Sequence, residues 1–168
     1  MRIISHRGNL NGIDRALENH PRHIAGLINQ PEMAIDVEVD LWYWNDKFYL
    51  GHDEPQNFIK QQWIEDHKYN LWIHCKNSEA LAMMLNHKDV NCFWHQQDDY
   101  TITSKNWVWC YPDKQPPGQE NSFPWIERHY LLSVGVLPEL NNTNIDNFTT
   151  ICTDQWIHYN DQINPVRP

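Results

Sequence analysis

Ala34-Ile35-Asp36-Val37-Glu38-Val39-Asp40-Leu41-Trp42 alternates strictly between apolar and acidic side chains over residues 35–41. A period of two predicts a β-strand with aliphatic side chains on one face and carboxylates on the other. Glu38 and Asp40 then point the same way, roughly 6.5–7 Å apart along the strand. Inside a barrel such charges are costly unless paired, and a hard divalent cation would offset that cost. A solvated acidic face on an edge strand explains the same pattern.

Short apolar runs that end in polar residues recur along the chain. They cover residues 2–6, 47–52, 71–76, 90–95, 107–111, 133–137 and 149–154. Helical patterns lie between several of them: one begins near Asn19 and Pro21, one covers 58–67, and one begins at Asn77 or Ser78. Strands that alternate with helices predict an α/β fold with a parallel sheet, and this many strands predict a barrel.

The length of the chain limits how complete that barrel is. A full eight-fold barrel takes about 250 residues, whereas this chain has 168. We therefore expect a single domain over residues 1–168: a compact or incomplete TIM-type (β/α) barrel with about seven strands and shortened helices. The run at 47–52 follows a turn and predicts a hairpin-like extension, and residues 113–121 read as a loop.

Charge and composition exclude several classes of protein. The formal net charge is −9, which argues against nucleic acid as a partner because clustered Lys and Arg hold phosphate backbones. An acidic protein still acts on a phosphate when a bound cation supplies positive charge. No apolar stretch approaches a membrane span and no targeting segment is visible, so we expect a cytoplasmic protein. The four cysteines lack metal-ligand spacing and are expected to be buried thiols.

Histidine placement favours a functional site. Of ten histidines, four end apolar runs: His6, His52, His74 and His95. Active sites of parallel barrels lie at the carboxyl ends of the strands. One such histidine is more often structural, but four at equivalent positions, together with two carboxylates, indicate a site. The other six histidines are interpreted as surface or capping residues.

Four motifs resemble, in order and spacing, the signature of the glycerophosphodiester phosphodiesterase family: Ser5-His6-Arg7-Gly8, Glu18-Asn19, Val37-Glu38-Val39-Asp40 and Gly51-His52-Asp53. That family belongs to the phospholipase C-like phosphodiesterases on TIM barrels. Ile151-Cys152-Thr153-Asp154 resembles its closing strand motif, so the resemblance runs from residue 5 to about 154. Three later segments resemble a compact subgroup: His74-Cys75-Lys76-Asn77, Phe93-Trp94-His95-Gln96 and Trp109-Cys110-Tyr111-Pro112.

The resemblance implies metal-dependent phosphodiester hydrolysis, an activity of lipid metabolism, and a role for each matching residue. The histidines act as general acid and base, the Arg contacts phosphate, the Glu-x-Asp pair binds a divalent cation, and the Glu before Asn orders the site. Imidazole titrates near neutral pH, as proton transfer requires. The expected set is catalytic His6 and His52, substrate-binding Arg7, Glu18, Lys76, His95 and Trp109, and metal-binding Glu38, Asp40 and His74.

One position departs from the family pattern. The third metal ligand of the family is a Glu two residues before a Lys, and His74 stands there, before Lys76. The metal is accordingly Mg²⁺, Ca²⁺ or Mn²⁺, with another transition metal allowed by the imidazole. Asp98, Asp99 and Glu139 are alternative sources of a carboxylate, although each also reads as a solvated acid or a cap.

The primary hypothesis is hydrolysis of a glycerophosphodiester-like or related small phosphodiester, with no protein partner implied. Trp94, Trp109 and Tyr111 either line the pocket for its alcohol or belong to the core. A second hypothesis is a catalytically degenerate barrel that binds a phosphate ligand or a metal without turnover. A metal-storage or metal-sensing protein is a third, disfavoured because the histidines are dispersed.

Overall fold

The structure is a computed structural model that describes residues 1–31, 33, 35–114, 132–137, 145 and 148–165. Ten strands and four helices lie within these residues. In chain order they are β1 (Arg2–His6), α1 (Pro21–Ile28), β2 (Asp36–Trp44), β3 (Lys47–Leu50), β4 (Asn57–Ile59), α2 (Gln61–His67), β5 (Leu71–Cys75), α3 (Ser78–Leu85), β6 (Asn91–Phe93), β7 (Tyr100–Ile102), β8 (Val108–Cys110), β9 (Ser133–Leu137), β10 (Thr150–Thr153) and α4 (Trp156–Ile163).

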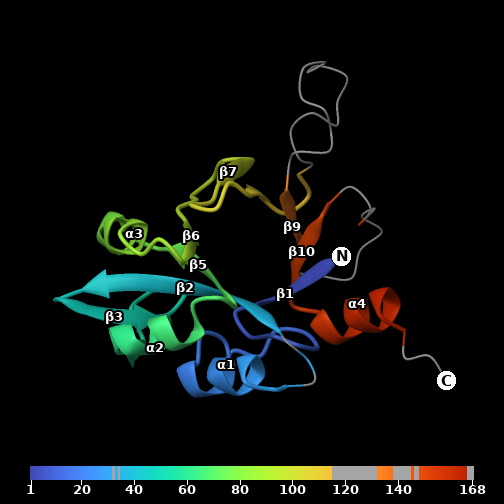
Figure 1. Ribbon diagram of the computed structural model, residues 1–168, viewed down its shortest axis with the longest axis horizontal. Coiled ribbons are helices and arrows are strands. Elements are labelled where there is room, and N and C mark those ends of the chain that lie inside the picture. The colour runs from blue at the N-terminus through green and yellow to red at the C-terminus, as the bar shows by residue number, and fades with distance from the viewer. Residues whose placement is uncertain (32, 34, 115–131, 138–144, 146–147, 166–168) are drawn as a thin grey trace, which may run out of the picture.

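The strands form one curled sheet of mixed direction (Figure 1). Seven strands of the described chain follow one another in parallel, in the order β6-β5-β2-β1-β10-β9-β8. β3 pairs with β2 in antiparallel fashion, β4 with β3, and β7 with β8. The fold is therefore mixed α/β, and the expectation of about seven parallel strands and a hairpin at 47–50 is confirmed. The described helices are short, at seven or eight residues each.

Strand β2 separates two apolar cores. Its aliphatic side chains lie in an outer core between the sheet and the helices, where Val37, Val39 and Leu41 are fully buried. Its carboxylates share the concave side of the sheet with a second cluster, made of Ile4, Trp72, Phe93, Trp109, Val134, Val136 and Cys152. Glu38 is 2% exposed and Asp40 is 0% exposed. The alternative of a solvated acidic edge is therefore wrong.

The sheet has a seam between β6 and β8, where no strand pairing joins the two among the described residues. Residues 94–107 form β7 and turns there instead of a helix. Ser104 bridges part of the seam: its N–H donates to Cys92 O at 2.8 Å, and its hydroxyl donates to Val90 O at 3.0 Å. The rings of Phe93 and Trp109 stack across it with centroids 4.4 Å apart.

Two details of the predicted helices differ in the structure. The helix expected over 58–67 begins at Gln61, because Phe58 and Ile59 pair with β3 as part of β4. Asn19 does not cap α1: the cap is His20, whose ring accepts from His23 N at 3.4 Å. Asn77 caps α3 as expected.

Four further expectations concern the rest of the chain. The cysteines Cys75, Cys92, Cys110 and Cys152 are free and buried, as expected. None of the helices in the described residues is both long and apolar enough to cross a membrane. Residues 115–121 of the expected loop and Glu139 lie outside the described residues.

The seam predicts that Ser104→Ala destabilises the fold. The Ser104 hydroxyl donates to the Val90 carbonyl and also accepts from Cys92 N at 3.0 Å, and alanine leaves both of these backbone groups unpaired. We expect the free energy of unfolding in urea to fall by about 1–2 kcal/mol. Ser78→Ala is the matched control, because the Ser78 hydroxyl bonds only the exposed Glu79. Equal stability of the two variants would show that the bridge contributes nothing.

Candidate metal and catalytic site

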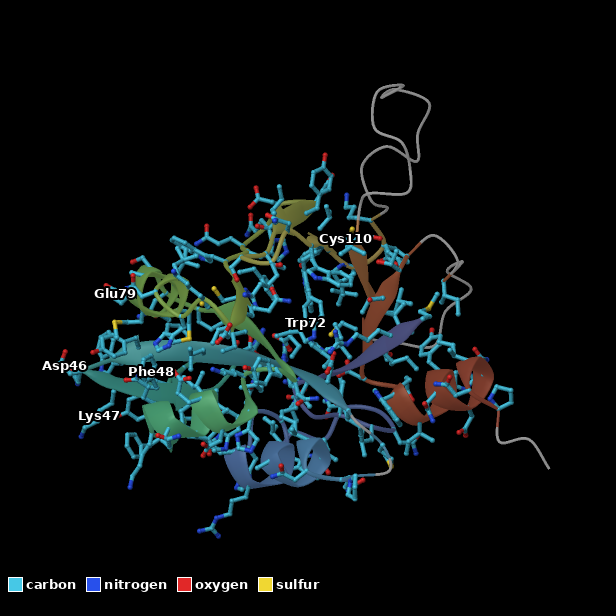
Figure 2. All side chains as sticks on the ribbon, viewed as in Figure 1. Asp46, Lys47, Phe48, Trp72, Glu79 and Cys110 are labelled. Atoms are coloured by element: carbon cyan, nitrogen blue, oxygen red, sulfur yellow. The ribbon has the colours of Figure 1, made fainter. Side chains whose placement is uncertain are left out.

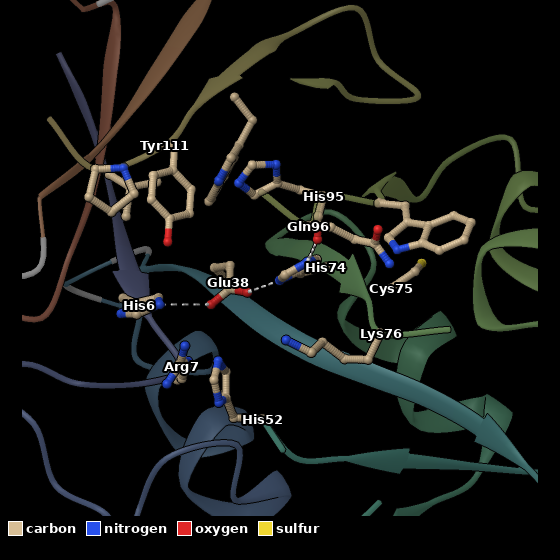
Figure 3. A pocket seen from close by; sticks show the side chains of 14 residues that line it. His6, Arg7, Glu38, His52, His74, Cys75, Lys76, His95, Gln96 and Tyr111 are labelled. Carbon is tan, nitrogen blue, oxygen red and sulfur yellow. Dashed lines mark hydrogen bonds and ion pairs between the residues drawn. The ribbon is translucent and has the colours of Figure 1, made fainter. Parts of the chain in front are cut away.

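One cavity of about 440 Å³ lies at the carboxyl ends of the parallel strands (Figure 3). All four strand-end histidines line it. The complete lining, called the central cavity below, is His6, Arg7, Glu38, His52, His74, Cys75, Lys76, Trp94, His95, Gln96, Trp109, Tyr111, Pro112 and Val136. Eight of the ten residues expected from the sequence line it. Asp40 and Glu18 do not: Asp40 contacts Arg7 and Lys76, and Glu18 contacts Arg7.

Asp40 is enclosed by polar partners on both of its oxygens. Its Oδ2 accepts from Asn19 Nδ2 at 2.9 Å and lies 3.0 Å from Arg7 Nε. Its Oδ1 lies 3.2 Å from His74 Nδ1 and 3.3 Å from Lys76 Nζ, neither in hydrogen-bonding geometry. Burial raises the pKa of Asp40, but His74, Arg7 and Lys76 outweigh it and hold that pKa well below its usual range. Asp40 is therefore a fixed negative charge.

Glu38 is buried with fewer close polar partners than Asp40. Its nearest polar neighbours are His6 Nε2 at 3.9 Å and His74 Nδ1 at 4.0 Å, and its Oε2 is buried without a hydrogen-bond partner among the described residues. Burial and the charge of Asp40 raise the pKa of Glu38, while His6, Arg7 and His74 oppose the rise. An unpartnered buried carboxylate oxygen costs free energy unless a cation or a donor reaches it.

The orientation of His74 fits a cation between these groups. His74 Nε2 lies 3.0 Å from the backbone oxygen of His95, which only an N–H can satisfy, so the proton is on Nε2. In the neutral ring the lone pair of Nδ1 then faces Glu38 and Asp40. Donation of one ring N–H to a carbonyl is the usual arrangement of a metal-binding histidine. Ligand atoms of Glu38, Asp40 and His74 lie within 4.8 Å of one another, and this buried group could hold a metal ion.

His6 is held by a second buried carboxylate. Its Nδ1 donates to Asp154 Oδ1 at 2.9 Å, and Asn9 Nδ2 donates to the same oxygen at 2.6 Å. The ring is thereby fixed with Nε2 toward Glu38 and the cavity. Burial lowers the pKa of His6, but the hydrogen bond to Asp154 and the charge of Glu38 outweigh it, so the pKa lies above its usual value.

His52 reaches the cavity from the hairpin and not from a parallel strand. β3 runs back along the upper part of β2, and Gly51 N donates to Asp40 O at 3.1 Å, which brings the next residue to the cavity. A side chain at Gly51 would collide with the Glu54 carbonyl oxygen, so glycine is required there. His52 Nδ1 donates to Asp53 Oδ1 at 2.7 Å. Partial burial and the nearby Arg7 lower the pKa of His52.

The turn after β1 aims Arg7 at the carboxylates. Arg7 has φ +55° and Gly8 has φ +90°, and a Cβ at Gly8 would press on His23 and Ile24. The left-handed backbone of Arg7 costs about 1 kcal/mol, and its ion pair with Asp40 offsets this. Glu18 lies behind the guanidinium, with its Oε1 3.7 Å from Arg7 Nη1. It orders the site and does not line the central cavity, so its expected contact with substrate is not seen.

The remaining expected residues divide into two groups. Lys76, His95 and Trp109 line the central cavity. Asp98 and Asp99, considered as replacement ligands, are exposed and separate from Glu38 and Asp40. The structure thus favours His74 itself as the third member of the buried group.

Three residues of the site were absent from the expected set of site residues, although Asn19 was expected near a helix start and Asp154 in a closing strand. Asp154 and Asn9 orient His6, and Asn19 holds both the side chain and the backbone N–H of Asp40. Asp154 could have been predicted as a site residue, because it ends a strand of a predicted parallel sheet as His6 does. No protein-family model, curated protein or solved structure matches this chain. The geometry of the site is therefore the basis on which a function can be assigned.

The buried group predicts which residues bind a divalent ion. Removing a ligand by Glu38→Gln or His74→Ala should weaken Mn²⁺ binding roughly 10- to 100-fold or more, measured by calorimetric titration. Asp99→Asn is the control, because Asp99 is exposed and pairs with Lys114 at 2.9 Å. Loss of affinity in the control but not in the other two variants would place the ion elsewhere.

Proposed function

We propose that this protein is a metal-dependent hydrolase of a glycerophosphodiester-like or related small phosphodiester, built on a compact TIM-type (β/α) barrel with shortened helices. One observation carries the proposal. A single cavity brings together two histidines of opposite pKa shift, two basic side chains and a buried group able to hold a metal ion. Seven parallel strands in curled succession support the barrel.

Arg7 and Lys76 bind the phosphate in this proposal. Both line the central cavity and both lie beside the fixed charge of Asp40, at 3.0 Å and 3.3 Å. These two ion pairs with Asp40 hold Arg7 and Lys76 at the position of the phosphate, and one carboxylate does not cancel both of their positive charges. A divalent ion held by Glu38, Asp40 and His74 would neutralise charge on the non-bridging oxygens.

The two histidines carry the protons. His52, with its pKa lowered, is the base: it takes a proton from the attacking hydroxyl, whose oxygen forms the new bond to phosphorus. His6, with its pKa raised, is the acid: its Nε2 proton goes to the leaving oxygen as the old phosphorus–oxygen bond breaks. Environments that push two pKa values apart assign the roles of acid and base. Overall, one water is added, giving a phosphomonoester and an alcohol.

A second candidate is a barrel that binds a phosphate ligand without turnover. The contacts of Asp40 favour it, because the cations Arg7 and Lys76 and the His74 ring already surround the carboxylate. A doubly protonated His74 would satisfy Glu38 and Asp40 in place of an ion. Turnover of bis(p-nitrophenyl) phosphate or glycerophosphocholine with added divalent ions separates the two candidates.

Substitution of either histidine should abolish most of the turnover. We expect His6→Ala and His52→Ala to lower kcat by roughly 10²- to 10⁴-fold, with unfolding free energy little changed for the half-exposed His52. His158→Ala is the control, because His158 is exposed and bonds only Gln162 on α4. Activity should rise with pH as His52 loses its proton and fall as His6 loses its own, which gives a bell-shaped profile. If either variant retains near-normal turnover, the histidine that it replaces does not take part in the mechanism.

The replacement of a family Glu by His74 predicts the metal preference. Imidazole removes a negative charge and adds a nitrogen donor, which weakens Mg²⁺ and Ca²⁺ relative to Mn²⁺, Co²⁺ or Zn²⁺. Wild-type activity should be highest with a transition metal, and His74→Glu should shift the preference toward Mg²⁺ or Ca²⁺. Assays of both proteins across these ions test this. An unchanged preference means that His74 is not a ligand.

A further inference from the structure

The central cavity has a second end that the proposed chemistry does not use. The reacting groups occupy one end, and Trp94, His95, Gln96, Trp109 and Tyr111 line the other. Figure 3 shows His95 and Tyr111 on the far side of His74 and Glu38 from Arg7 and His52. A volume of about 440 Å³ exceeds what a phosphate and a three-carbon alcohol occupy. The far end therefore selects one of the groups esterified to the phosphate.

Flat aromatic faces dominate this end. Trp94 is 39% exposed and Tyr111 is 44% exposed, although both line the cavity. Tyr111 packs edge-on against His95 with centroids 5.2 Å apart, Trp109 stacks on Phe93 at 4.4 Å, and Phe93 stacks on His74 at 5.1 Å. Exposed indole and phenol rings bind planar ligands by stacking, worth about 1–3 kcal/mol per base.

Hydrogen-bonding capacity at this end is unused. Both ring nitrogens of His95 are buried without a partner among the described residues. In either neutral tautomer one nitrogen donates and the other accepts. Gln96 lines the same end and offers an amide donor and an amide acceptor. A ligand edge with both donors and acceptors would satisfy groups that otherwise stay unpaired, which a plain hydrocarbon cannot do.

The charges of the lining disfavour a cationic group. Among the described residues that line the cavity, Glu38 is the only acid, whereas Arg7 and Lys76 are basic. Asp98 does not line the central cavity; it lines a neighbouring hollow that Trp94, His95 and Gln96 also line. A quaternary ammonium group in the central cavity would thus meet aromatic rings and two basic side chains.

We infer that the far end binds a nucleobase, so that the substrate is a small phosphodiester of a nucleoside. The inference rests on the proposed function, which supplies the hydrolysis reaction. The residues of the far end supply the selectivity for the substrate. His95 reads the base edge, and Trp94 and Tyr111 stack on its faces.

The test compares diesters that share glycerol 3-phosphate and differ in the second alcohol: adenosine, uridine, choline and 1-octanol. With Mn²⁺ present, kcat/KM for at least one nucleoside diester should exceed that for the choline and octyl diesters by roughly tenfold or more. Equal or better hydrolysis of the choline or octyl diester overturns the inference while leaving the proposed hydrolysis intact.

Variants of His95 separate base recognition from a structural role. His95→Ala should lower kcat/KM for the nucleoside diesters roughly 5- to 100-fold, and more than for the octyl diester. His95→Gln, which keeps a donor and an acceptor, should restore part of the loss. Tyr69→Ala is the control, because Tyr69 is 74% exposed and lies outside the central cavity. Equal losses for all diesters would contradict the assignment.

If no diester is hydrolysed, the proposed hydrolysis is wrong but the inferred nucleobase site is not yet tested. A binding experiment tests that site. Adenosine 5′-monophosphate should then still quench the tryptophan fluorescence on titration, and His95→Ala should weaken that binding. Absence of binding to the wild-type protein overturns the inference as well.

Discussion

The burial of two neighbouring carboxylates in the concave side of the sheet is the constraint on which the rest of the site depends. Removing one partner from a buried ion pair costs about 3–5 kcal/mol, so the charge of Asp40 fixes the positions of the groups around it. Arg7, Asn19 and the pair His74 and Lys76 come from three separate segments and meet at this one carboxylate. Figure 2 shows how side chains fill the space between the sheet and the helices.

The same constraint explains unusual backbone nearby. Arg7 and Asn19 both have positive φ, and both side chains bind Asp40 Oδ2. Their backbones are also joined, because Asn19 N donates to Arg7 O at 3.0 Å. The turn after β1 and the entry to α1 thus form one unit around the carboxylate. Strain in two residues is offset by several charge-assisted contacts.

Much of the framework was predictable because it is local. Alternation in residues 35–41 determines which side chains of β2 face inward, and strand-end histidines predict the cavity. The partners of His6 and Asp40 were not predictable from local pattern, because Asp154 is 148 residues away from His6 and Asn19 is 21 residues away from Asp40. Asn19 precedes Pro21 and reads as a cap, and only the tertiary fold shows that its amide has a stronger acceptor.

Other misses have the same origin. Phe58 and Ile59 fit a helical pattern, yet β3 offers them a ladder partner, and pairing overrides propensity. Glu18 faces the Arg7 guanidinium and does not line the central cavity, an arrangement that depends on the left-handed turn at Arg7. Asp98 and Asp99, possible ligands that read equally well as solvated acids, are exposed.

The seam between β6 and β8 has a mechanical consequence. The two walls of the far end stand on opposite sides of it, with His95 following β6 and Tyr111 following β8. In the described chain they are joined by the Ser104 bridge, by the hydrogen bond from Thr101 Oγ1 to Trp94 O and by ring contacts, and not by a ladder of strand hydrogen bonds between β6 and β8. Ring stacking yields to small sliding displacements at far lower cost than a ladder does. The curled sheet is therefore least stiff at this seam, so the aromatic end of the cavity resists deformation less than the charged end, which rests on paired strands.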